Sequence, residues 1–227
     1  MSDLGRNGSV GRAARSKPRR YGFARLFYRR EYPHGAAVSV EAGAARPIDT
    51  LCFRELNEHT VAGREVEELV KPLVEGRSAG VISEAGVPGV ADPGALVVEA
   101  CHRRGIRVVP LVGPSSIVMA VMASGLNGQS FAFNGYLPVK PPERVQAIRR
   151  FERRAHAEGQ SQLFIEAPYR NVKLMEQLLQ TLAPETRLTV AMDITAPGEF
   201  IRTLRVREWR AAELPAMNKR PAIFIIG

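Results

Sequence analysis

The sequence predicts an α/β protein with two domains, the first built on a largely parallel sheet and the second on a mixed sheet. Apolar strands alternate with amphipathic helices from residue 51 onward, which is typical of right-handed crossovers. Three prolines, at 138, 141 and 142, follow a strand and predict a linker. The 227 residues, 45% of them apolar, are enough for one large or two small cores. The expected division is an atypical basic segment over 1–46, a first domain over 47–137 and a second over 138–227.

The elements of the first domain follow in order after Pro47, and none is expected before it. Residues 51–56 predict a strand, 66–76 a helix stopped by Gly76, and 79–83 a short buried strand. A turn-rich loop leads to a helix over 95–105 and a strand over 106–111. The next helix begins at Ser115 or Ser116 and ends at Gly125.

The second domain has one adjacent pair of strands, which predicts the mixed sheet. A helix is expected over 143–157, a strand over 162–167 and a helix over 171–182. Strands over 187–194 and 199–206 follow without a helix between them, and a closing strand covers 221–226.

The net charge of +9 suggests a polyanionic partner, but its distribution weakens that inference. Residues 1–46 hold ten Lys and Arg against three acids, so the remainder carries only +2. No apolar run reaches the roughly 20 residues that span a bilayer, and we expect a soluble cytoplasmic protein without a membrane partner. Two cysteines without C-x-x-C spacing and four scattered histidines predict neither disulfides nor a metal site.

Two loops carry the strongest candidate chemistry. "VISEAGVPGVADPG" (81–94) leaves a strand with three glycines, two prolines and two acids, and glycine lets a backbone approach a ligand closely. From spacing alone a rigid connection capped by Asp92 is the commoner explanation. "LVGPSS" (111–116) is expected at the same sheet edge and crevice, where Ser115 or Ser116 is also an ordinary helix N-cap.

Two further segments, residues 165–171 and the helix over 143–157, can each be explained either by structure or by function. "IEAPYRN" (165–171) places polar side chains at a strand end, as either surface polarity or a site. The helix over 143–157 carries five arginines that could meet phosphates, although a solvated face is the commoner explanation.

Taken together, "ELNEHT", "VISEAGVPGVADPG", "GIRVVPLVGPSS", "ASGLNGQSFAFNGYLP" and "LFIEAPYRN" resemble the tetrapyrrole (corrin and porphyrin) methylase superfamily. Their nearest likeness is to the ribosomal RNA small subunit methyltransferase I family, over about residues 47–227. The resemblance implies a two-domain homodimeric enzyme that binds S-adenosylmethionine between its domains. It also implies methyl transfer to a ribose hydroxyl of small-subunit ribosomal RNA, or to a tetrapyrrole or other small molecule as in other branches.

The resemblance also assigns site residues, position by position. Glu166 and Arg170 would deprotonate or position the acceptor hydroxyl. The residues matching the cofactor pocket are Ser83, Glu84, Ala85, Gly86, Val87, Asp92, Pro93 and Gly94, with Gly113, Pro114, Ser115 and Ser116 opposite. Two positions depart from the family pattern, since Glu84 stands where Asp is usual and Tyr169 where His is usual.

The family's opening strand and "TPLG"-like loop have no counterpart in residues 1–46. "LFYRREYPHGAAVS" (26–39) can be encoded by DNA that, shifted by one base, gives YFIAENTRTARQF, similar to the family's "IAAEDTRxSRxLL". We therefore hypothesise that residues 1 to about 42 are translated out of frame, which the coding DNA would test. A transit peptide and a disordered RNA-binding arm are the alternatives.

The frame hypothesis has a physical consequence. A parallel sheet without its opening strand exposes apolar surface and an unpaired edge, which promotes aggregation. It predicts that this chain binds S-adenosylmethionine poorly or not at all, and that it is an inactive remnant of such an enzyme.

Overall fold

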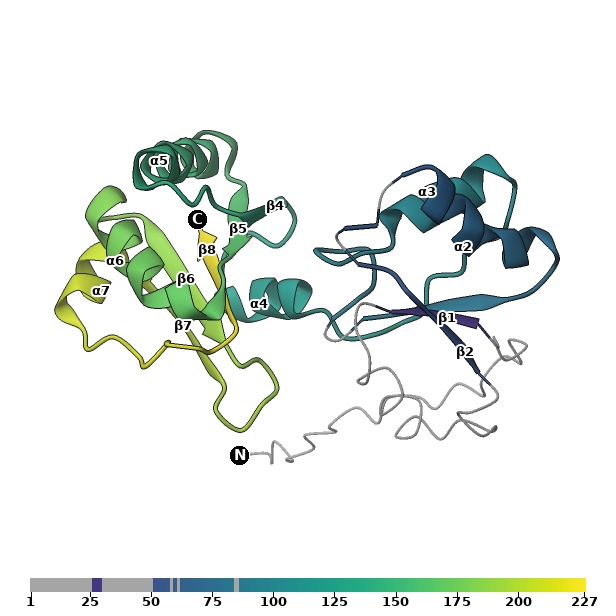
Figure 1. The fold of residues 1–227 in the computed structure, drawn as a ribbon. Helices are drawn as coiled ribbons and strands as arrows, with labels where there is room; N and C mark the ends of the chain where they lie inside the picture. Colours follow the sequence, from purple (N-terminus) through teal and green to yellow (C-terminus); the bar gives the residue numbers. More distant parts are fainter. Residues whose placement is uncertain (1–25, 30–50, 58, 61, 84–85) are drawn as a thin grey trace, which may run out of the picture. The chain divides into compact units, whose positions relative to one another are not determined.

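The computed structural model describes residues 26–29, 51–57, 59–60, 62–83 and 86–227 (Figure 1). The chain forms two compact units, the first reaching Leu111 and the second beginning at Val112. This boundary lies before the one expected from the prolines, because strand β4 (Phe131–Tyr136) pairs in parallel with β5 (Ser161–Ile165) and so belongs to the second unit. Pro141 and Pro142 begin helix α5 (Pro141–Glu158), where proline's missing N–H costs nothing.

The first unit contains a three-stranded parallel sheet in the order β2-β1-β3, covering Cys52–Glu55, Leu26–Arg29 and Ala79–Ile82. Helices α2 (Arg64–Val74) and α3 (Ala95–Arg103) pack against each other. Their core consists of Leu56, Val66, Leu69, Val70, Val97, Ala100 and Cys101. The strands and helices expected over 51–105 are thus confirmed, and so is the parallel sheet.

Two expectations for the first unit were wrong. Strand β1 lies before Pro47, where no strand was expected, and Leu26 is opposite both Cys52 and Ala79. A four-residue run is too short to show alternation in the sequence. Conversely, residues 106–111 form no strand, although their apolar run predicted one. Leu111 and Val112 are 75% and 107% exposed, since a strand needs a hydrogen-bonding partner as well as an apolar sequence.

The second unit contains a five-stranded sheet in the order β4-β5-β8-β6-β7. Only β4 and β5 are parallel; β8 (Ala222–Ile226) runs antiparallel to β5 and to β6 (Arg187–Met192), which is antiparallel to β7 (Phe200–Arg205). The mixed sheet expected from adjacent strands is confirmed.

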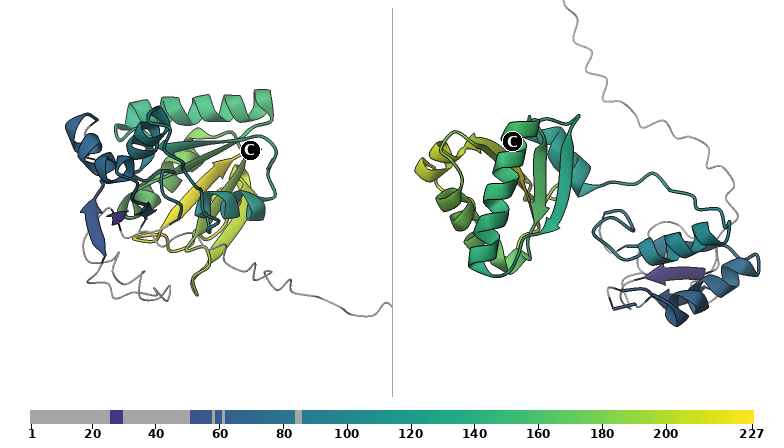
Figure 2. Two further views of the ribbon diagram at one scale, coloured as in Figure 1. Left: turned by 90° about the vertical axis from the view of Figure 1, so that its right-hand side faces the viewer. Right: turned by 90° about the horizontal axis from the view of Figure 1, so that it is seen from above.

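Helices cover both faces of this sheet because its strands alternate between two apolar surfaces. Phe164 and Phe224 belong to the larger core with α5, α6 (Asn171–Thr181) and α7 (Val206–Ala211). Leu163 and Ile223 belong to the opposite core with α4 (Ser116–Ser124). Figure 2 shows α5 running across the first of these faces. Within the described residues, no helix has an apolar stretch that could span a membrane.

Candidate functional site

The loop after β3 has an unusually constrained backbone. Gly86, Gly89 and Gly94 have φ angles of 77°, 79° and 140°, and Ala91 has φ 55°, all in the region that favours glycine. Of the predicted cofactor residues here, Glu84 and Ala85 lie outside the described part of the chain. Gly94 is the N-cap residue of α3 and has no side-chain cap, which disagrees with the alternative explanation of a connection capped by Asp92.

The same loop presents its backbone openly. Among the described residues, a Cβ built on Gly86 or Gly89 would meet no atom within 4 Å, whereas one on Gly94 would lie 3.5 Å from the nitrogen of Gly89. Asp92 is half-buried and forms no ion pair with another residue that the structure describes. The loop leaves the carboxyl end of a parallel strand, where ligands bind in open α/β sheets. These features fit a cationic ligand such as S-adenosylmethionine, held by backbone contacts and balanced by a carboxylate.

The loop Gly113, Pro114, Ser115 and Ser116 lies at the start of the second unit. Ser115 is the N-cap residue of α4, as expected, and its carbonyl accepts a hydrogen bond from the N–H of Met119 at 2.9 Å. No side chain of the described residues makes a capping hydrogen bond here, so Ser115 occupies the N-cap position without capping the first N–H groups of α4. The common crevice predicted for this loop and the loop after β3 would join residues of different units, and it stays a prediction.

Glu166 and Arg170 are brought together at the end of β5 by a 3₁₀ turn, Pro168–Arg170. Arg170 donates from Nε at 2.9 Å and from Nη2 at 2.6 Å to Oε1 of Glu166, and the N–H of Ala167 donates to the same oxygen at 2.8 Å. The Glu166 side chain is fully buried, and that of Arg170 is 25% exposed. The carboxylate therefore fixes the guanidinium of a side chain that remains partly exposed.

Two buried acceptors beside this pair have no hydrogen-bond donor among the described residues, namely Oε2 of Glu166 and Oδ1 of Asn171. Nδ2 of Asn171 donates to the carbonyl of Arg220 at 2.6 Å, which ties the start of α6 to the segment before β8. A buried acceptor without a hydrogen-bond donor costs free energy. Oε2 of Glu166 and Oδ1 of Asn171 therefore favour a bound water or a ligand that donates a hydrogen bond. Tyr169, next to the pair, is 67% exposed, and the Arg170 guanidinium lies 5.4 Å from its ring centroid.

Asp193 and Arg220 lie at the same sheet edge, and neither was predicted as a site residue. β5 and β6 are each antiparallel to β8, so Glu166 and Asp193 follow strands that end on one edge. Nε of Arg220 donates to Oδ2 of Asp193 at 2.6 Å, and its other nitrogens donate to the carbonyls of Ala216 and Gly198. The signal in the sequence was an acid directly after each strand.

The backbone of this edge is strained. Asp193, Thr195 and Lys219 have φ angles of 47°, 71° and 60°, which non-glycine residues seldom adopt. Such conformations persist only where the surroundings enforce them, and they are common at ligand sites. Within the described residues, no group of three or more His, Cys, Asp or Glu could hold a metal ion.

Comparisons with known proteins point in one direction. The family model of the tetrapyrrole (corrin/porphyrin) methylases matches residues 27–209, including part of the atypical basic segment. The chain is 32% identical over 161 residues to the ribosomal RNA small subunit methyltransferase I of Vibrio cholerae, covering 71% of this chain and 54% of that one. It is 34% identical over 193 residues to the protein of that name from Xylella fastidiosa, covering 85% and 67%.

The chain thus spans between about half and two thirds of the length of these relatives. A solved structure, that of the methyltransferase CobJ, superposes with a TM-score of 0.55 at 18% identity, covering 90% of this chain and 94% of the other. At that identity the likeness concerns the fold alone.

Proposed function

Since this chain belongs to the tetrapyrrole (corrin/porphyrin) methylase family, we propose that it is an S-adenosylmethionine-dependent methyltransferase whose acceptor is a ribose 2′-hydroxyl of small-subunit ribosomal RNA. The observation that carries this proposal is the 30–34% identity to relatives named ribosomal RNA small subunit methyltransferase I. A homodimer in the cytoplasm is part of the same proposal.

The cofactor would be held by residues of both units. S-adenosylmethionine supplies an electrophilic methyl group on a sulfonium, so its charge favours a carboxylate nearby. Asp92 would provide that carboxylate, and the open backbone at Gly86 would allow close approach. The full proposed set is Ser83, Glu84, Ala85, Gly86, Val87, Asp92, Pro93, Gly94, Gly113, Pro114, Ser115 and Ser116.

Arg170 and Glu166 would act on the acceptor in different ways. The Arg170 side chain is partly exposed, and its guanidinium could hold a ribose or phosphate oxygen, which would fix the hydroxyl for displacement. Glu166 is buried with Oε1 already occupied, so its geometry favours positioning Arg170. Deprotonation of the acceptor by Glu166 stays a prediction, and it would require the hydroxyl to reach Oε2.

A tetrapyrrole or other small-molecule acceptor is the second candidate, favoured by Tyr169 in place of the family's histidine. Labelled methyl groups from S-adenosylmethionine should enter small ribosomal subunits taken from a strain that lacks the gene, but not those of its parent. Labelling of a tetrapyrrole instead would contradict the RNA acceptor.

Cofactor binding separates an enzyme from an inactive remnant. Calorimetric titration of the purified 227-residue chain with S-adenosylmethionine should give micromolar binding if the proposed function holds. That result would also refute the poor binding predicted from the frame hypothesis, whereas no binding would support the remnant.

A further inference from the structure

Helix α5 carries five arginines that the structure divides into different groups. Arg144 is buried and donates to the carbonyls of Pro138, at 2.9 Å, and Val139, so its role is structural. Nε of Arg154 lies 3.1 Å from Oε2 of Glu158. Arg149, Arg150 and Arg153 are exposed, and none of them forms an ion pair with another residue in the described part of the chain.

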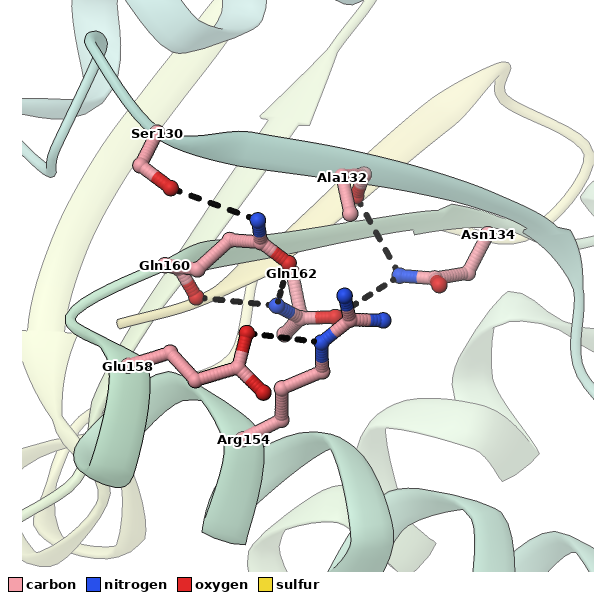
Figure 3. Close-up of polar contacts among 7 residues, drawn as sticks. All are labelled: Ser130, Ala132, Asn134, Arg154, Glu158, Gln160 and Gln162. Carbon is pink, nitrogen blue, oxygen red and sulfur yellow. Dashed lines mark hydrogen bonds and ion pairs between the residues drawn. The ribbon is translucent and has the colours of Figure 1, made fainter.

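The surroundings of Arg154 explain why it differs from these three. Figure 3 draws its ion pair with Glu158 together with the amides that link β4 and β5. There Nδ2 of Asn134 donates to Oε1 of Gln162 at 3.2 Å, and Nε2 of Gln162 donates to Gln160 at 3.0 Å. These amides form hydrogen bonds with one another, and Arg154 forms an ion pair with Glu158. The polar groups on this side of α5 thus have partners within the chain.

The three remaining arginines share the outward face of α5. Ala147, Ile148, Phe151 and Ala155 are buried against the sheet. At about 100° per residue, Arg149, Arg150 and Arg153 fall within roughly 100° of one another on the opposite side. The Arg150 guanidinium lies 5.1 Å from the ring centroid of Phe151, which supports its side chain. We call these three residues the arginine face.

The charge of the second unit supports a polyanionic partner, independently of the basic segment at residues 1–46. Residues 112–227 hold 15 Lys and Arg against 10 Asp and Glu, a net charge of +5. Residues 51–111 hold 7 against 9, a net charge of −2. Some other basic side chains of the second unit are paired with acids, as where Arg205 and Arg207 share Glu185.

We infer that the arginine face, Arg149, Arg150 and Arg153, binds the phosphate backbone of RNA. This inference rests on the proposed RNA acceptor and names the surface that would hold it. Guanidinium groups present paired N–H donors that match phosphate oxygens. The exposed positions that continue this stripe along the helix include Pro142, Gln146, His156 and Ala157, so the face lacks the large apolar side chains with which interfacial helices enter membranes.

The test compares two triple variants of the full chain that lose the same charge. R149Q/R150Q/R153Q removes the arginine face. The control R64Q/R103Q/R207Q removes three exposed arginines that are paired with Glu68, Glu99 and Glu185. The probe is a labelled oligouridylate of about 20 nucleotides, long enough for an extended surface. Both variants should unfold at the temperature of the parent, because all six side chains are exposed.

Loss of the arginine face should weaken oligouridylate binding about 10- to 100-fold at 0.1 M salt, and should reduce the slope of log K against log salt by about 2. The control should change both by much less. Equal losses in the two variants would overturn the inference, because net charge would then explain them. It would also be overturned if the first variant lost affinity for polyglutamate or for anionic vesicles while keeping its affinity for oligouridylate.

Methyl transfer distinguishes this inference from the proposed function. If R149Q/R150Q/R153Q methylates small ribosomal subunits with the KM of the parent, the arginine face is refuted and the function stands. If the parent chain transfers no methyl group while its RNA affinity depends on these arginines, the function fails and the binding surface stands.

Discussion

Nη2 of Arg170 lies 2.6 Å from Oε1 of Glu166, and the Glu166 side chain is fully buried while that of Arg170 is 25% exposed. An ion pair of this kind is expensive to break from one side only, since the remaining charge loses its partner. Glu166 therefore holds Arg170 in position through hydrogen bonds. Substitutions of each residue can separate their contributions to stability from their roles in function.

Replacing Arg170 by Met should lower the free energy of unfolding by about 2–3 kcal/mol, because Glu166 would be left buried without its partner. Glu166→Gln should cost only about 1 kcal/mol, because Arg170 can turn to water and the amide still accepts a hydrogen bond. Urea denaturation of both variants and of the double variant measures the coupling. The matched control is Arg154→Met, whose exposed pair with Glu158 should contribute less than about 1 kcal/mol. Equal costs for Arg154→Met and Arg170→Met would contradict this account.

Gly94→Ala should weaken S-adenosylmethionine binding and destabilise the first unit, because φ 140° strains any residue with a Cβ. The added carbon would also lie against Gly89 and Val81. Gly105→Ala is the control, since Gly105 also has a positive φ with free space around it but follows α3, away from the loop. Calorimetric titration and thermal unfolding measure the two effects. A cofactor affinity that falls equally in both variants would assign the loss to the fold and not to the loop.

Thr195→Gly should leave the free energy of unfolding unchanged or raise it by up to about 1 kcal/mol, because glycine relieves the strain of φ 71°. The same change at Thr181, in the last turn of α6, should cost up to about 1 kcal/mol, because glycine weakens a helix. Chemical denaturation of both variants measures whether the free energy of unfolding rises or falls at each position. Destabilisation of similar size at both positions would show that Thr195 is not strained.

Burial raises the pKa of the Cys101 thiol above its usual value, although nearby Arg104 partly opposes this effect. Cys52 is exposed, so at pH 8 a thiol reagent should label Cys52 quickly and Cys101 only as fast as the first unit opens. Because the pKa is raised in the folded chain, the stability that the Cys101 thiol contributes is present below its unfolded pKa and is lost as pH rises through the folded value. Mass spectrometry of labelling across pH, with Cys52→Ser as control, checks both statements. Equal labelling rates for the two cysteines at pH 8 would contradict them.

The exposed apolar segment before α4 should promote association of the chain. Leu111→Lys together with Val112→Lys should reduce light scattering by the folded protein without changing its free energy of unfolding, since both side chains are exposed. Val118→Lys, at an exposed apolar position on α4, is the control for added charge. An equal reduction of scattering in the control would assign the effect to net charge.

Local patterns in the sequence determined most of the elements and the type of both sheets. Val66, Leu69 and Val70 recur at helical spacing, and Gly125 ends α4 with φ 67° as a C-cap. The alternation of strands and helices over 51–105 predicted the parallel sheet, and the adjacent strands β6 and β7 predicted the mixed one. These features depend on residues that are close together in the chain, so they can be predicted from a single sequence.

The tertiary structure alone decided which segments find partners. The apolar residues 106–111 form no strand, while Leu26–Arg29 do, because pairing depends on which edges are available and not on composition. The hydrogen bond between Arg220 and Asp193 joins residues that are 27 positions apart in the chain. The carboxylate of Glu166 holds Arg170 in place only because the fold buries that carboxylate. Likewise, α5 contains five arginines, but only the packing of the helix shows which three are exposed and have no ion pair among the described residues.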